Sequence, residues 1–117
     1  MDQEEMRGRT KEFAQQVINL CKRLPNTREG RLVGDQLFKA GTAVGANYRA
    51  ACRARSRAEF VAKLGIVLEE ADESLYWLEL LDGSNVIKTS LLTPLMSEAD
   101  ELVAIFVTSL NTAKAKD

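Results

Sequence analysis

The apolar residues of this chain recur with the period of an α-helix, and that period constrains the fold more than any other feature of the sequence. At about 100° per residue, they gather on one face of each of four successive segments. A chain of 117 residues has the size of one domain and can bury a core without disulfides or bound metal. We therefore expect one all-α domain over residues 1–117.

Each segment contributes one stripe of inward-facing residues to the expected core. The four stripes, in chain order, are Met6, Phe13, Val17, Leu20, Cys21 and Leu24; Val33, Leu37, Ala40, Val44, Asn47, Tyr48 and Ala51; Phe60, Leu64, Val67, Leu68, Ala71, Leu75, Trp77 and Leu78; and Leu92, Leu95, Ala99, Leu102, Val103, Phe106 and Leu110. We expect the asparagine to hydrogen-bond across the core and fix the register. Short links between long amphipathic helices predict an antiparallel up-down-up-down four-helix bundle.

Capping residues and helix breakers place the ends of the first two helices. The first helix starts near the N-terminus and is ended by Pro25 and Asn26, because proline disrupts a helix interior. Thr27 is the predicted N-cap of the second helix, since its hydroxyl can accept a hydrogen bond from an amide of the first turn. That helix is expected to run roughly to Ala54.

The third helix has the clearest start signal. Ser56 and Glu59 form a capping box, in which each side chain can accept from the other residue's amide. Asp82 followed by Gly83 predicts the stop of this helix. The fourth helix should begin between Ser90 and Pro94, because proline is tolerated in a first turn.

Small and apolar residues also lie outside the core stripes. Glycine in a helix interior costs about 1 kcal/mol relative to alanine, so Gly34, Gly41 and Gly45 in the interior of the second helix need a reason. Close packing of a neighbouring helix inside the bundle is one reason, and a subunit interface is the other. A second apolar patch on the third helix favours the interface. The predicted interface residues are Gly34, Phe38, Gly41, Gly45, Ile66, Tyr76 and Leu80.

Residues with catalytic or metal-binding chemistry are scarce. Histidine, the commonest general base and metal ligand, is absent from the sequence. Cys21 and Cys52 make no zinc motif. Glu69, Glu70, Asp72 and Glu73 could offer oxygen ligands to a hard cation, but a solvated face or ion pairs between subunits account better for such a helical run. We predict no enzymatic activity, no cofactor and no metal site.

Basic residues are concentrated in the middle of the chain. Residues 28–63 hold eight Lys or Arg against three Asp or Glu, whereas residues 64–101 hold one lysine against nine acids. A stripe of cations on the second helix, extended around the following turn, suits the phosphate backbone of a nucleic acid. The alternative is pairing with the acids of the third helix, which would leave little net effect. The predicted binding residues are Arg31, Lys39, Arg49, Arg53, Arg55, Arg57 and Lys63.

Five runs in the middle of the chain resemble a known family. They read Ala43-Val44-Gly45-Ala46-Asn47-Tyr48-Arg49-Ala50-Ala51, then Ala54 to Phe60, Lys63 to Ile66, Leu68 to Ser74 and Trp77-Leu78. The pattern is similar to the bacterial four-helix bundles named for the intervening sequence of 23S ribosomal RNA genes. The resemblance implies a barrel-shaped homopentamer. It also implies kinship with the accessory subunit of diversity-generating retroelements, which binds nucleic acid through basic surfaces.

These features together predict a non-enzymatic homo-oligomer whose second helix contacts the backbone of RNA or DNA. The alternative is a scaffold that binds another protein and no nucleic acid, with the arginines pairing across subunits. The sequence has no apolar run long enough for a membrane span, and its acidic first residues do not form a signal peptide. We therefore expect a cytoplasmic location and no membrane partner.

Overall fold

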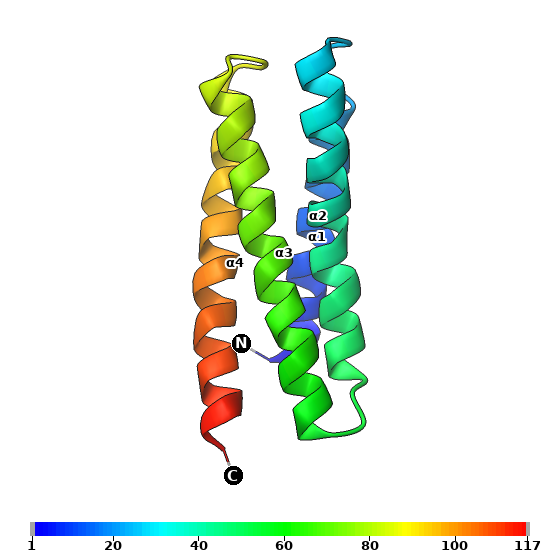
Figure 1. Cartoon of the computed structure of the whole chain (residues 1–117), viewed down its shortest axis with the longest axis vertical. Helices are drawn as coiled ribbons and strands as arrows, with labels where there is room; N and C mark the ends of the chain where they lie inside the picture. The colour runs from blue at the N-terminus through cyan, green and yellow to red at the C-terminus, as the bar shows by residue number, and fades with distance from the viewer. Residues whose placement is uncertain (1, 117) are drawn as a thin grey trace.

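Four long helices make up nearly all of the structure. The computed structural model describes residues 2–116, in which α1 spans Gln3–Cys21, α2 Arg28–Cys52, α3 Arg57–Gly83 and α4 Thr89–Ala115. Consecutive helices run in opposite directions and are joined by short links (Figure 1). The predicted antiparallel up-down-up-down four-helix bundle is confirmed.

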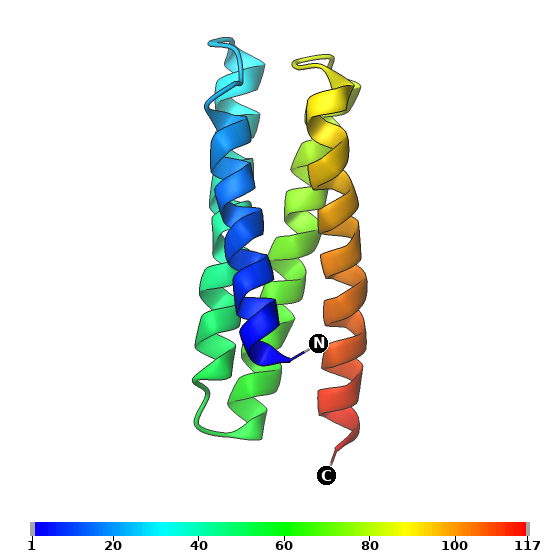
Figure 2. The same ribbon diagram turned by 180° about the vertical axis from the view of Figure 1, so that it is seen from behind.

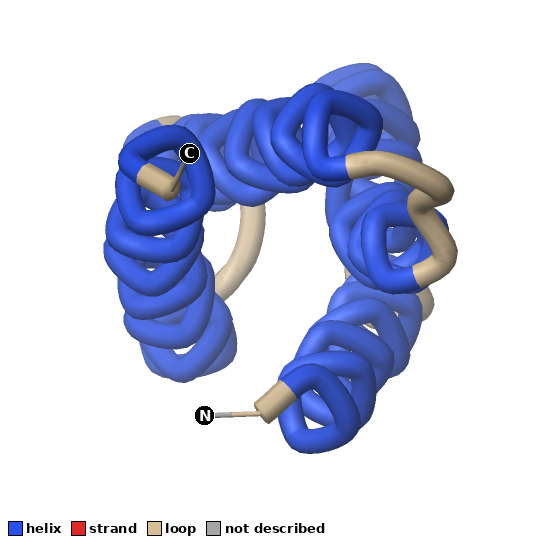
Figure 3. The backbone as a smooth tube through the Cα atoms, turned by 90° about the horizontal axis from the view of Figure 1, so that it is seen from below, coloured by secondary structure: helices blue, strands red, loops and turns tan. Residues whose placement is uncertain are grey.

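The helices stand at the corners of a square, in chain order (Figure 3). α2 and α3 pack together most extensively, and α1 and α4 pack together least. α1 is also the shortest, with 19 residues against 25 to 27 in the others. It therefore begins well above the end of the bundle where α2 turns into α3 (Figure 2). We call that end the α2–α3 end.

The predicted apolar stripes form the core of the bundle. The stripe residues that are fully buried are Met6, Phe13, Val17, Leu20, Leu37, Ala40, Val44, Tyr48, Ala51, Leu64, Val67, Ala71, Leu78, Leu92, Leu95, Ala99, Leu102 and Phe106. Thr10 and Ser74 are also buried, and each hydroxyl donates to a carbonyl one turn earlier, at 2.9 and 2.8 Å respectively. These bonds satisfy both hydroxyls without a partner on another helix.

Asn47 does not bond across the core as the sequence suggested. It is half-buried, and its side-chain amide donates to the carbonyl oxygen of Ala43 in its own helix at 2.8 Å. The reason is geometric, because a short amide side chain reaches the carbonyl one turn back without any help from a neighbouring helix. Asn47 therefore does not set the register between helices.

Most predicted helix ends lie within two residues of the observed ones. Thr27 and Ser56 are the N-caps of α2 and α3, and their hydroxyls accept from amides three residues on. The capping box at Ser56 is only half formed, since no hydrogen bond within residues 2–116 returns from its amide to the Glu59 carboxylate. α4 begins at Thr89, one residue before the predicted window, which leaves Pro94 inside the helix.

The glycines of α2 face α1 within the same chain, and their assignment to a subunit interface stays a prediction. A Cβ on Gly41 would lie 2.7 Å from Val17 Cγ2, and one on Gly34 would lie 2.7 Å from Leu24 Cδ1. A Cβ on Gly45 would lie 3.3 Å from the backbone of Thr10. The glycines thus allow α1 and α2 to approach closely, which was the other reason that the sequence left open.

One ion pair joins the two helices that pack least. The Arg9 guanidinium of α1 donates from Nε and Nη2 to the two carboxylate oxygens of Glu98 on α4, both at 2.7 Å. Glu101 lies 3.4 Å from the same guanidinium. The bidentate hydrogen bond with Glu98 raises the pKa of Arg9 further above its usual range, against the opposing effect of burial. This pairing therefore ties α1 to α4 at mid-height.

We expect the Arg9–Glu98 pair to contribute about 1 kcal/mol of coupling energy, because it is bidentate and its side chains are only 24% and 22% exposed. A double-mutant cycle with Arg9→Gln and Glu98→Gln, followed by urea unfolding, measures this energy. The coupling should shrink at high salt. If the free-energy changes of the two single variants add up to that of the double variant, the pair contributes no coupling energy to stability.

Candidate nucleic-acid interface

The outward face of α2 is lined with cations. Its buried stripe points toward the other three helices, and the residues on the opposite side of the helix point to solvent. Five basic side chains lie there with a single acid, Asp35, among them. The basic side chains on this face, all exposed, are Arg28, Arg31, Lys39, Arg49 and Arg53. The predicted basic stripe is therefore a continuous exposed surface, which we call the α2 face.

Intrachain pairing does not neutralise the α2 face. Within residues 2–116 the ion pairs are those of Arg9, and none joins an arginine of α2 to an acid of α3. Arg31 donates to the Asn26 side-chain oxygen at 3.0 Å, which is a neutral partner. The positive charge of this face therefore remains available to an anion from outside the protomer.

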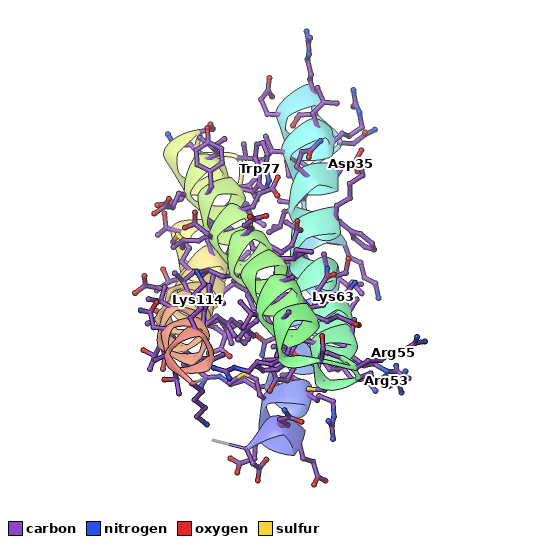
Figure 4. All side chains as sticks on the ribbon, turned by 60° about the horizontal axis from the view of Figure 1, so that its bottom comes forward. Asp35, Arg53, Arg55, Lys63, Trp77 and Lys114 are labelled. Atoms are coloured by element: carbon purple, nitrogen blue, oxygen red, sulfur yellow. The ribbon has the colours of Figure 1, made fainter. Side chains whose placement is uncertain are left out.

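The predicted binding residues beyond α2 differ in where their side chains lie, and their role in binding stays a prediction. Arg53 and Arg55 project away from the bundle at the α2–α3 end (Figure 4). Arg57, the first residue of α3, instead donates from Nε and Nη2 to the carbonyl oxygen of Ala113, both at 3.1 Å. Arg57 thus holds the last turns of α4. Lys63 is half-buried on the side of α3 that faces α2 (Figure 4).

A basic groove between α1 and α2 adds residues that the sequence analysis did not find. The groove has a volume of about 460 Å³, and its cations are Arg7 and Lys11 of α1 together with Arg49 of α2. Small residues, including Gly8 and Gly45, form much of the rest of its lining. The signal was present in the sequence as two cations four residues apart on one side of α1, but only the tertiary structure places them beside Arg49.

The outward face of α3 has the opposite charge. Glu69, Asp72 and Glu73 are exposed there, beside the predicted interface residues Ile66 and Tyr76, which are 39% and 53% exposed. We call this surface the α3 face. Apolar and acidic side chains alternate on it, as in surfaces that pack against another protein.

Local contacts shape the α3 face further. Trp77 donates from its indole to the Glu73 carboxylate at 3.2 Å and packs edge-on against Tyr76. Burial, with added repulsion from Glu73 and Glu69, raises the pKa of Glu70. Leu80 is half-buried at the far end of this face. The interface prediction for Phe38, Ile66, Tyr76 and Leu80 remains a prediction.

The remaining reactive side chains are half-buried, as Cys21 and Cys52 are, or buried, as Tyr48 is. Burial raises the pKa of the Cys21 thiol to about 11, and its sulfur lies 3.7 Å from the carbonyl oxygen of Gly34. Burial, together with the neighbouring Cys52, raises the pKa of Tyr48 to about 12. In the described part of the chain, no three acidic or cysteine side chains are placed to share a metal ion. No helix within the described range is both long and apolar enough to span a membrane.

This chain is similar to one family model and to a solved structure. The family model described as 23S rRNA-intervening sequence protein matches residues 3–108. A crystal structure of a protein of unknown function, from the S23 ribosomal protein family of Bacteroides thetaiotaomicron, is 33% identical. It superimposes with a TM-score of 0.87 over 95% of this chain and 99% of that one. A comparison with curated proteins gives no match.

Proposed function

This chain belongs to the family of 23S rRNA-intervening sequence proteins, and on that premise we propose that it is a non-enzymatic cytoplasmic homo-oligomer that binds the phosphate backbone of RNA or DNA. The observation that carries the proposal is the α2 face, which exposes five cations that no acid of the same protomer neutralises within residues 2–116. Cations spaced along an exposed helix attract phosphates without reading their sequence.

Self-association is the second part of the proposal. Phe38 on α2 and Ile66 and Tyr76 on α3 leave large apolar surfaces exposed in the protomer. The α2 face is basic and the α3 face is acidic. A contact between the α2 face of one chain and the α3 face of the next is therefore complementary in charge, and it covers apolar area on both sides. Repetition of such a head-to-tail contact forms a ring where the rotation between neighbours closes, and we propose that it closes as a pentamer.

The two parts of the proposal use different stretches of α2. Phe38 lies in the upper half of the helix, while Arg53 and Arg55 lie at the α2–α3 end. At 1.5 Å per residue, Phe38 and Arg53 are about 22 Å apart along the helix. A subunit contact at Phe38 therefore leaves the arginines of the α2–α3 end accessible. We propose that the nucleic acid binds chiefly there.

Salt dependence tests the binding. Fluorescence anisotropy with a short labelled RNA duplex, and with the DNA duplex of the same sequence, gives the dissociation constant between about 50 and 200 mM salt. Removing Arg53 and Arg55 with Arg53→Gln and Arg55→Gln should lower the slope of log K against log salt by about two, because each lost phosphate contact removes about 0.9. The loss should be similar for every sequence tested.

A charge-matched control separates local contacts from total charge. Lys22→Gln and Arg23→Gln remove the same two charges at the end of α1, far from the α2–α3 end. Their slope should stay close to that of the unmodified protein. If both double variants lose the same amount of salt slope, the effect depends on the net charge of the protein and not on contacts at the α2–α3 end.

A scaffold that binds only proteins is the second candidate, and the acidic α3 face is the observation that favours it. If Arg53 and Arg55 served only to pair with Glu69 and Glu73 of a neighbouring chain, the protein would not bind either duplex. The double variant would then change the mass measured by light scattering. This outcome would show that Arg53 and Arg55 serve assembly and not nucleic-acid binding.

A further inference from the structure

The groove between α1 and α2 has the properties of an anion site. Arg7 and Lys11 reach it from α1 and Arg49 from α2, so three positive charges from two helices border one cavity of about 460 Å³. No carboxylate is among its lining residues. None of the three side chains makes an ion pair within residues 2–116. The charge of all three is therefore open to an anion from outside the protomer.

The residue types in the groove suit a phosphate group. Guanidinium groups donate paired N–H bonds in a geometry that matches phosphate oxygens, and a lysine adds a compact charge. The groove lacks the aromatic side chains on which bases stack. Its chemistry therefore fits the backbone of a nucleic acid and not its bases.

Gly8 borders the groove, and no neighbouring atom of the same chain requires a glycine there. A Cβ at this position would meet nothing within 4 Å, whereas Gly45 across the groove is constrained by the backbone of Thr10. Glycine in a helix interior is unfavourable, so packing within the chain gives no reason for Gly8. A longer side chain there would extend from α1 into or over the groove and obstruct it.

The position of the groove connects it with the α2–α3 end. Arg49 borders the groove, and Arg53 lies one helical turn further along the same face of α2, about 6 Å away. A strand held at Arg53 and Arg55 therefore passes close to the groove opening.

We propose that the α1–α2 groove binds a phosphodiester group of an RNA or DNA strand between Arg7, Lys11 and Arg49. The inference rests on the proposed function, and it adds α1 to the binding surface. It also makes the short N-terminal helix a contributor to binding as well as to packing.

The charge test uses α1 alone. Arg7→Gln and Lys11→Gln leave every cation of α2 in place, and Lys22→Gln with Arg23→Gln again removes two charges from the far end of α1. With the same RNA and DNA duplexes, the groove variant should lose about two units of salt slope, and the control should lose none. Equal slopes in the two double variants would overturn the groove site.

A steric test keeps all the charges. Gly8→Leu adds a side chain over the groove, while Gly8→Ala adds only a methyl group and serves as the matched control. Both variants should melt at a higher temperature than the unmodified protein, because both improve helix propensity. Only Gly8→Leu should also weaken binding, by about tenfold. Unchanged affinity in a folded Gly8→Leu protein would show that the strand does not enter the groove.

Failure of the groove and failure of the proposed function give different results. If the unmodified protein binds and the Arg53→Gln, Arg55→Gln variant loses slope while the groove variants behave normally, the α2–α3 end binds nucleic acid and the groove does not. If the unmodified protein binds neither duplex at low salt, the proposed function itself is overturned.

Discussion

Replacing Gly41 with leucine is expected to lower the free energy of unfolding by about 3 kcal/mol, the upper end of the usual cost of overpacking. A Cβ at Gly41 would lie 2.7 and 2.8 Å from the two γ-carbons of Val17. Val17 is completely buried, and its branched side chain has almost no alternative rotamer in a helix. The clash can be relieved only by moving α1 away from α2, which opens the core. Urea unfolding followed by circular dichroism measures the loss.

Gly8→Ala is the control for Gly41→Leu, because a Cβ at Gly8 meets nothing within 4 Å. This substitution should raise the free energy of unfolding by up to about 1 kcal/mol through helix propensity alone. Replacing a glycine is therefore expected to lower the free energy of unfolding at position 41 and to raise it at position 8. If Gly41→Leu unfolds like the unmodified protein, α1 does not approach α2 as closely as the structure places it.

The sequence specified the fold well because the fold depends on short-range signals. The apolar period fixes which side of each helix is buried, and Thr27 and Ser56 fix where two of the helices begin. These signals act within a helical turn, so they can be read from neighbouring residues. The antiparallel order then follows from links too short to let consecutive helices run parallel.

The sequence was less informative about contacts whose partner lies on another helix. A glycine stripe permits close approach of any backbone, and its period does not say whether that backbone belongs to α1 or to another subunit. For the same reason, the sequence does not indicate that Arg57 donates to the Ala113 carbonyl, 56 positions along the chain. Arg7 and Lys11 gain their significance only from their closeness to Arg49. Each of these facts is a long-range contact, which local periodicity does not encode.

The charge distribution is compatible with the proposal that one small protomer both assembles and binds nucleic acid. A net charge of -1 conceals a basic α2 face and an acidic α3 face. In a ring built by contact of these two faces, part of the opposite charge is paired between subunits. The arginines near the α2–α3 end, which lie away from Phe38, then form a repeated basic rim. Several weak backbone contacts around such a rim would act together on one nucleic acid.

Replacing Ile66 with glutamate should dissociate the proposed pentamer while leaving the protomer folded. Ile66 is 39% exposed in the single chain, so a carboxylate there remains solvated, and its repulsion of Glu69 and Glu70 one turn away costs only a few tenths of a kcal/mol. In the proposed contact Ile66 covers apolar area of the next chain, so the same carboxylate would lose its hydration against an apolar surface. That costs about 3 kcal/mol or more, which weakens each contact at least a hundredfold. Light scattering should show the mass of five chains falling to that of one.

Val107→Glu is the matched control for Ile66→Glu, because Val107 is 41% exposed and lies on α4, outside the α3 face. Its variant should keep the mass of the unmodified protein. Dissociation of Ile66→Glu alone would assign the subunit contact to the α3 face. It would also allow nucleic-acid binding to be measured on single protomers, where a basic rim no longer exists and affinity should fall although every arginine is still present. An Ile66→Glu protein that keeps the mass of five chains would instead show that the α3 face points to solvent, and that the subunits meet elsewhere.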